Sequence, residues 1–211
     1  SLQYRDGHKI SEQSIHMTFG TALHEVLQHY LDVMYKESGA EADRIDIEEL
    51  FEETLRKCYA EDYKKNKGKH FSSPEELREF FEDGKAILNN FKKKKNAHFS
   101  KKGWYLVGCE LPIVMAPNLR LNNVKYMGYL DIVMYHEPTN TFKIIDIKTS
   151  TKGWGSHAKK DESKQFQLVL YKYFFSKQYN VPIENIDIEF FIVRRKVYLG
   201  GEYPQKRIQT F

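Results

Sequence analysis

Two strand-like segments joined by a short turn restrict the possible folds of this chain more than any other feature. The segments, residues 125–135 and 141–149, are rich in β-branched and aromatic side chains. Between them stands His-Glu-Pro-Thr-Asn (136–140), a composition typical of a turn. We therefore expect an antiparallel β-hairpin.

The second segment carries an acid in an unusual place. Side chains alternate between the two faces of a strand, so Asp146 and Lys148 share one face. Ile145 and Ile147 point to the other face, toward a core. An Asp-x-Lys pair on a strand usually marks a solvated polar face. Here the acid interrupts the apolar run 144–147, which predicts that it is buried, and buried acids usually have a function.

A second acid is expected opposite the first. If the hairpin is symmetric about Pro138 and Thr139, Asp131 faces Asp146, with Cβ atoms on the order of 5 Å apart. Two carboxylates this close repel each other, and Lys148 offsets only part of the repulsion. A divalent cation offsets the rest, and hard oxygen ligands suit Mg²⁺ or Mn²⁺.

Length and composition favour one domain. A chain of 211 residues with 41% hydrophobic content can bury one sizeable core, and no long Gly-, Ser- or Pro-rich tract divides it. We therefore expect a single domain over residues 1–211. The net charge is only +4, but lysines and arginines gather in runs. Such runs are usually solvated faces, and nucleic-acid binding is the less frequent alternative. The runs are 92–95, 101–102, 159–160 and 194–196.

The cysteine count and the hydropathy pattern exclude several classes of protein. Cys58 and Cys109 are too few for a disulfide framework, a four-thiolate zinc site or an iron–sulfur cluster held by one chain. No segment resembles a signal peptide or approaches the roughly 20 apolar residues that span a bilayer. We expect a soluble protein of the cytoplasm or host-cell interior, without membrane contact.

The remaining chain alternates helix and strand patterns, which places it in the α/β class. Apolar spacing predicts helices over 19–35, 46–63, 161–178 and from Ser73 into the lysine run, with strands over 104–111 and 185–194. The helices between about 40 and 100 are expected to form a lobe inserted between the first helix and the core sheet. The final strand, helix, strand order predicts a crossover with parallel pairing. The expected core is a mixed sheet that joins the antiparallel hairpin to this parallel strand, with flanking helices.

Several polar residues elsewhere are candidates for a site. His24 lies at the edge of the apolar face of the first helix, where a histidine is more often packed than a ligand. A zinc-protease motif is excluded because His29 lies five residues further, about 140° around the helix. Gln167 and Tyr171 are four apart and share a helix face, which a surface hydrogen bond explains equally well. Glu110, near the end of the first predicted strand, is a further buried-acid candidate.

Five short motifs occur along the chain in a characteristic order. They are Gly20-Thr-Ala-Leu-His24, Gly108-Cys-Glu110, Gly128-Tyr-Leu-Asp131, Ile145-Asp-Ile-Lys-Thr149 and Gln167-Leu-Val-Leu-Tyr171. Carried on a helix, a strand, a hairpin and a second helix, they resemble the RecB-type branch of the PD-(D/E)XK nuclease superfamily. That branch contains lambda exonuclease relatives and many phage-encoded members.

The resemblance implies a role for each matching residue. The implied ligands of one or two Mg²⁺ or Mn²⁺ ions are His24, Asp131, Asp146 and the main-chain carbonyl of Ile147. Lys148 would orient or deprotonate the attacking water and counter charge on the scissile phosphate, and Glu110 would hold this lysine or a metal-bound water. Gln167 and Tyr171 would line the site and touch the nucleic-acid backbone. The four cluster cysteines of some relatives are missing, so we expect no iron–sulfur cluster.

The function implied is that of a metal-dependent deoxyribonuclease, more specifically an exonuclease that acts on DNA ends in recombination, repair or replication. An RNA endonuclease of similar fold and a non-catalytic nucleic-acid-binding module are the alternatives. The loop after the predicted catalytic strand carries Lys152 and Trp154. We expect both to contact nucleic acid, with Trp154 stacked on a base, although Trp154 fits a core position equally well. Relatives often extend beyond both ends, so this sequence is also expected to be part of a longer protein.

Overall fold

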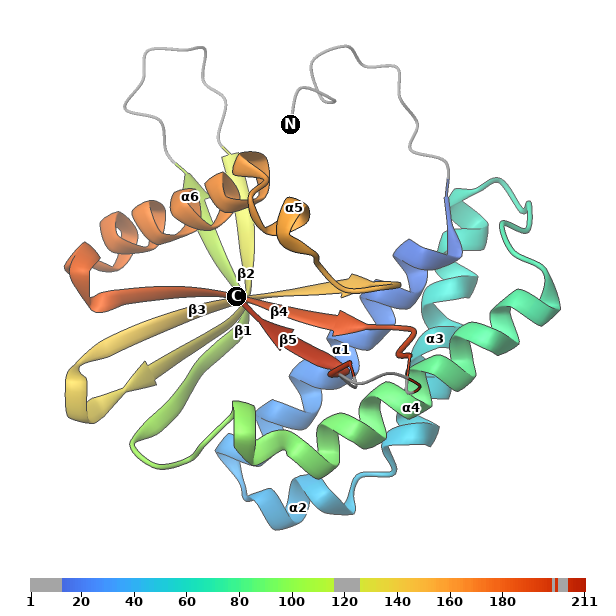
Figure 1. The fold of residues 1–211 in the computed structure, drawn as a ribbon, viewed down its shortest axis with the longest axis horizontal. Helices are drawn as coiled ribbons and strands as arrows, with labels where there is room; N and C mark the ends of the chain where they lie inside the picture. The colour runs from blue at the N-terminus through green and yellow to red at the C-terminus, as the bar shows by residue number, and fades with distance from the viewer. Residues whose placement is uncertain (1–12, 116–125, 199, 201–204) are drawn as a thin grey trace.

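The computed structural model describes residues 13–115, 126–198, 200 and 205–211, and these form a mixed five-stranded sheet flanked by helices (Figure 1). The strands are β1 (Trp104–Met115), β2 (Tyr126–His136), β3 (Thr141–Ser150), β4 (Ile186–Arg194) and β5 (Ile208–Thr210). They lie in numerical order; β3 and β4 are parallel and all other neighbours are antiparallel. The predicted α/β fold, with an antiparallel hairpin and a parallel strand beside it, is confirmed.

The hairpin has the predicted register. The pairs run from His136–Thr141 to Ile132–Ile145, symmetric about the turn. Residue 125, predicted to begin the first arm, lies outside the described residues. Beyond the last pair, the Ile147 N–H donates to the Asp131 side-chain Oδ2 at 2.7 Å. A carboxylate thus occupies the point where the regular pairing of β2 and β3 ends.

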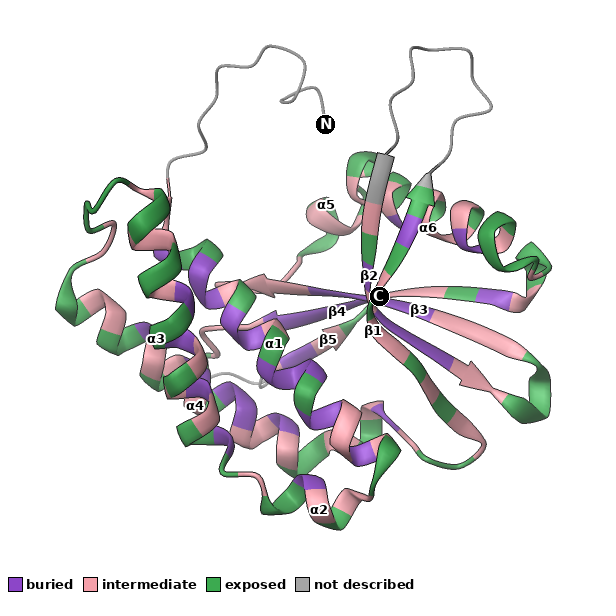
Figure 2. Cartoon of the chain, turned by 180° about the vertical axis from the view of Figure 1, so that it is seen from behind, coloured by how far each residue is buried: buried purple, intermediate pink, exposed green. Residues whose placement is uncertain are grey.

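Helices cover the sheet on both faces and supply most of the core. They are α1 (Ile15–Lys36), α2 (Gly39–Arg44), α3 (Ile47–Lys65), α4 (Pro74–His98), α5 (Ser156–Lys159) and α6 (Glu162–Tyr179), with short 3₁₀ turns η2 (Glu137–Thr139) and η3 (Ile183–Asn185). Ile145 and Ile147 pack into one cluster with α1, α3 and α4, as predicted. A second cluster lies between the other face of the sheet and α6. Figure 2 shows buried residues along α1 and along the strands.

Three helices, α2 to α4, follow α1 and precede β1, and Figure 1 shows them together beside α1. The Ser73 side chain accepts from the Glu76 N–H and Pro74 occupies the first turn, so the predicted start of α4 is confirmed. α3 and α4 cross closely because Gly84 has no Cβ, which would collide with the Phe51 ring. That these helices are a lobe of one single domain stays a prediction.

The first strand is longer than predicted, because it reaches Met115 rather than residue 111. Pro112 lacks an N–H and often ends a strand, but β1 is an edge strand, where a missing donor is tolerated. Gln178 of α6 covers the free edge here: it accepts from the Val114 N–H at 2.9 Å and donates to the Pro112 carbonyl at 3.2 Å. No helix among the described residues is long and apolar enough to cross a membrane.

Candidate active site

The predicted catalytic acid and lysine lie side by side on β3. Asp146 is 3% exposed, so the acid predicted to be buried is buried. The Lys148 ammonium lies 2.7 Å from Asp146 Oδ2, yet this oxygen has no hydrogen bond of normal geometry among the described residues. Lys148 therefore faces Asp146. The Asp146 oxygen can still accept a hydrogen bond or bind a metal ion.

Asp131 of β2 connects this pair to α1. Its Oδ2 accepts from the Ile147 N–H and lies 3.8 Å from His24 Nδ1. The main chain of Ile147 also interacts with the His24 imidazole. The structure thus brings together all four groups that the resemblance implies as metal ligands, from three separate elements.

Burial governs the protonation of these groups. It raises the pKa of Asp131 to about 6, against the opposing effects of the Ile147 N–H and Lys148. It also raises the pKa of Asp146, again opposed by Lys148. The pKa of His24 falls to about 4, first through burial and then through the Lys148 charge. At neutral pH His24 is therefore a neutral imidazole with a free lone pair. It lies near Asp131 and Asp146, whose ionised forms a nearby cation would stabilise.

Glu110 is exposed, so the prediction that it is a buried acid is wrong. It lies on an irregular stretch of backbone next to the site. β1 contains a register shift between Leu106 and Gly108, and Glu110 itself has a positive φ of 50°. The Gln28 amide holds it: Nε2 donates to Glu110 Oε1 at 2.8 Å and to the Asp131 main-chain carbonyl at 3.0 Å. The Gln28 amide therefore fixes the position of the Glu110 carboxylate.

Gln28 is a site residue that the sequence reasoning missed. It is 7% exposed, in a helix whose other buried side chains are nearly all apolar. The available signal was its spacing, because it follows His24 by four residues and so shares a helix face with it. A glutamine on a predicted core face, four residues from a candidate metal ligand, is a candidate for a side chain that positions the ligands by hydrogen bonds.

Gln167 and Tyr171 lie together on α6 beside the acids. Gln167 Nε2 donates to the Tyr171 hydroxyl at 2.8 Å. Burial raises the pKa of Tyr171, and the charges of Asp146 and Lys148 also act on it. These two side chains form the α6 wall of the site, and contact with nucleic acid stays a prediction for both.

The loop after β3 holds Trp154 against the sheet. Its ring centroid lies 4.8 Å from that of Phe190, and Lys164 Nζ lies 5.2 Å from the Trp154 ring. The Gln209 amide bonds both the N–H and the carbonyl of Trp154. Trp154 is thus a packed side chain in this structure, Lys152 is exposed, and their contact with nucleic acid is untested.

The donor set fits a hard divalent ion. The described residues include no group of three His, Cys, Asp or Glu side chains already close enough to hold a metal. The chemistry of the donors nevertheless suits Mg²⁺ or Mn²⁺: the buried Asp146 carboxylate, with an oxygen lacking a hydrogen bond, the half-buried Asp131 carboxylate and a neutral imidazole.

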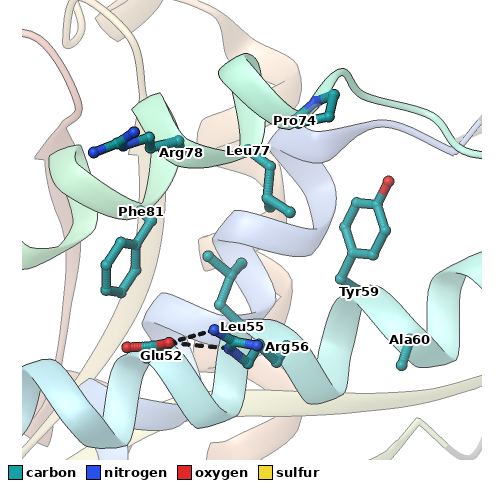
Figure 3. A pocket seen from close by; sticks show the side chains of 9 residues that line it. All are labelled: Glu52, Leu55, Arg56, Tyr59, Ala60, Pro74, Leu77, Arg78 and Phe81. Atoms are coloured by element: carbon teal, nitrogen blue, oxygen red, sulfur yellow. Dashed lines mark hydrogen bonds and ion pairs between the residues drawn. The ribbon is translucent and has the colours of Figure 1, made fainter.

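An apolar pocket of the described structure lies elsewhere. A pocket of about 420 Å³ opens between α3 and α4 (Figure 3). Its lining is Glu52, Leu55, Arg56, Tyr59, Ala60, Pro74, Leu77, Arg78 and Phe81. None of these is a predicted site residue, and Arg56 is paired with Glu52. The pocket is therefore separate from the catalytic constellation.

Comparison with known proteins adds independent evidence. The family model described as the PD-(D/E)XK nuclease superfamily matches residues 1–209, nearly the whole chain. No curated protein matches the sequence. The family match agrees with the mixed sheet and with the two acids and the lysine on its central hairpin. The chain belongs to the PD-(D/E)XK nuclease superfamily.

Proposed function

We propose that this protein is a divalent-metal-dependent deoxyribonuclease of the RecB-type branch that acts as an exonuclease on DNA ends. Membership of the superfamily implies a phosphodiesterase nuclease with a nucleic-acid substrate and a divalent metal. The observation that carries the proposal is the convergence of Asp131, Asp146, Lys148 and His24 where the pairing of β2 and β3 ends. The choice of DNA and of its ends rests on the motifs alone.

The same geometry suggests what each side chain does. Asp131, Asp146, His24 and the Ile147 carbonyl would hold Mg²⁺ or Mn²⁺, which supplies positive charge for the phosphate and lowers the pKa of a bound water. Lys148 is 34% exposed, so its ammonium can reach solvent and orient the attacking water. Its charge also opposes the negative charge that builds up on the scissile phosphate. Glu110, held by Gln28, would accept a hydrogen bond from that lysine or water.

The test is digestion of end-labelled linear DNA, single- and double-stranded, beside a closed circle and a matched RNA, with Mn²⁺, Mg²⁺ or EDTA. We expect metal-dependent loss of linear DNA with the circle and the RNA spared. Lys148→Ala and Asp146→Asn should each abolish cleavage without loss of fold. Lys143→Ala is the matched control, because Lys143 lies on the same strand but pairs with Glu189.

Each other outcome contradicts a specific part of the proposal. Nicking of the circle would make the protein an endonuclease. Cleavage of RNA alone would mean that the substrate is RNA and not DNA. Wild-type cleavage rates in both Lys148→Ala and Asp146→Asn would mean that these two residues are not catalytic. Binding without cleavage under every condition would leave only a nucleic-acid-binding module.

A further inference from the structure

The turn between α3 and α4 carries an uncompensated group of cations. We call residues 63–72 the lobe tip; it contains Lys64, Lys65, Lys67 and Lys69 but no acid. Lys65 pairs with Asp62 at 3.2 Å. The other three lysines are exposed, and none has a side-chain partner among the described residues. Lys64 and Lys65 suit the C-terminal dipole of α3, but Lys67 and Lys69 lie beyond the helix, so the dipole does not account for them.

Several residues of the other basic runs make internal ion pairs. Arg195 and Lys196 both pair with Asp83, at 2.7 and 2.8 Å, and tie β4 to α4. Lys95 pairs with Asp43 at 2.7 Å. At the lobe tip only Lys65 pairs with an acid, and the side chains of Lys64, Lys67 and Lys69 neutralise none within the described structure.

Aromatic rings stand among these lysines. Phe71 stacks on Tyr59, with ring centroids 4.5 Å apart and planes inclined by 28°. His70 lies against Tyr63, with centroids 4.8 Å apart, and its Nδ1 is 3.2 Å from the Tyr59 hydroxyl. Exposed cations interleaved with partly exposed aromatic rings form the surface on which a single nucleic-acid strand binds, phosphates on the cations and bases on the rings.

α1 connects the lobe tip to the candidate active site. Near its start, Thr18 Oγ1 donates to Oδ2 of Asp62, directly before the lobe tip, at 2.7 Å. Two residues on, a Cβ at Gly20 would lie 3.2 Å from Thr149 Oγ1, next to Lys148. From Thr18 to His24 the helix rises by about 9 Å, the length of about three stacked nucleotides. Figure 1 shows the lobe tip beside the beginning of α1.

We propose that the lobe tip binds a single-stranded segment of the nucleic-acid substrate a few nucleotides from the scissile phosphate. This inference rests on the proposed nuclease function and extends it: the substrate must present an unpaired strand long enough to pass along α1. The lobe tip then supplies affinity, while the hairpin supplies the chemistry.

The test compares two triple variants with the same charge change. Lys64→Gln/Lys67→Gln/Lys69→Gln removes the three unpaired lobe-tip charges, and Lys93→Gln/Lys94→Gln/Lys102→Gln removes three exposed lysines, two near the C-terminal end of α4 and one beyond it. Binding of fluorescent single-stranded DNA of about 15 nucleotides, and of the matching duplex, is measured by anisotropy in EDTA at several salt concentrations. Cleavage with Mn²⁺ is measured on the same strand, on a duplex and on a fragment of about four nucleotides.

We expect the lobe-tip variant to bind the long strand at least tenfold more weakly. The slope of log K against log salt concentration should fall in magnitude by about 2, because each of the three lost phosphate contacts contributes about 0.7. Its kcat/KM should fall on the long strand, with kcat retained and cleavage of the short fragment unchanged. The control triple variant should match wild type throughout.

The outcomes separate the two proposals. If wild type cleaves DNA and both triple variants bind it equally well, the lobe tip is not a nucleic-acid site and the nuclease proposal stands. If the variant loses affinity for the duplex but not for the single strand, the assignment to an unpaired strand is wrong. A wild-type protein that neither binds nor cleaves any nucleic acid overturns the proposed function itself.

Discussion

Asp131 and His24 show how one buried environment acts on an acid and a base. Burial disfavours the charged form of each, so the pKa of Asp131 rises from 3.8 to about 6 while that of His24 falls from 6.5 to about 4. Around neutral pH both groups are therefore in the form that binds a metal ion, a carboxylate and a neutral imidazole. Keeping Asp131 charged in this buried environment at neutral pH lowers the stability of the folded protein.

The two shifts predict opposite pH dependences of stability in EDTA. Between about pH 4 and 6 folded Asp131 binds a proton that the unfolded chain has lost, so its contribution to stability falls as pH rises. Between about pH 4 and 6.5 unfolded His24 is protonated and folded His24 is not, so its contribution rises with pH. In Asp131→Asn the free energy of unfolding should therefore rise more steeply with pH than in wild type, and in His24→Gln less steeply. Urea unfolding from pH 4 to 7 measures this; three parallel curves would contradict it.

At the scale of the elements, local sequence patterns correctly predicted the features that depend on residues close in sequence. The alternation around Asp146 placed β3 and its buried acid, and Ser73-Pro74 placed the start of α4. Local patterns failed where a residue distant in sequence determines the structure. The end of β1 was predicted too early, because the strand continues past Pro112, where Gln178 covers its edge. Gln28 was missed for the same reason, since its partner Glu110 lies 82 residues away. The hairpin acids could be found from sequence. The spacing of Gln28 from His24 marked it as a candidate, but its contacts with Glu110 and Asp131 could not be predicted.

Gln28 ties α1 to β1 and β2, which makes it a positioning residue for Glu110 and Asp131. We expect Gln28→Ala to raise the Mn²⁺ concentration for half-maximal cleavage by about 10- to 100-fold, the usual effect of losing a group that orients metal ligands. DNA affinity in EDTA should not change. His29→Ala, an exposed neighbour on the same helix, is the control. An unchanged metal requirement in Gln28→Ala would mean that the amide has only a packing role.

At the scale of the whole molecule, one ionic cluster joins the helices α2 to α4 to the sheet. Arg195, directly after β4, lies over the Phe80 ring with its guanidinium carbon 4.1 Å from the centroid, and Nη1 donates to Asp83 Oδ2 at 2.7 Å. Arg207 Nη1 donates to the carbonyls of Arg194 and Arg195, which connects the same point to the segment before β5. This cluster supports the prediction of a single domain, because it makes the stability of α4 depend on the sheet.

Glu79 and Asp83 contact the same two cations but differ in exposure, which provides a matched pair of variants. Asp83→Ala removes the half-buried partner of Arg195, which is itself 12% exposed, so we expect the free energy of unfolding to fall by about 2 kcal/mol. Glu79 is 51% exposed, and Glu79→Ala should cost less than about 1 kcal/mol because such a contact is screened by water. Urea unfolding followed by far-ultraviolet circular dichroism reports mainly the helices, and tryptophan fluorescence reports the sheet side, where Trp104 and Trp154 lie. Both signals should shift together in Asp83→Ala. A shift in the helical signal alone would mean that α2 to α4 unfold independently of the sheet, and the chain would then contain two cooperative units rather than one.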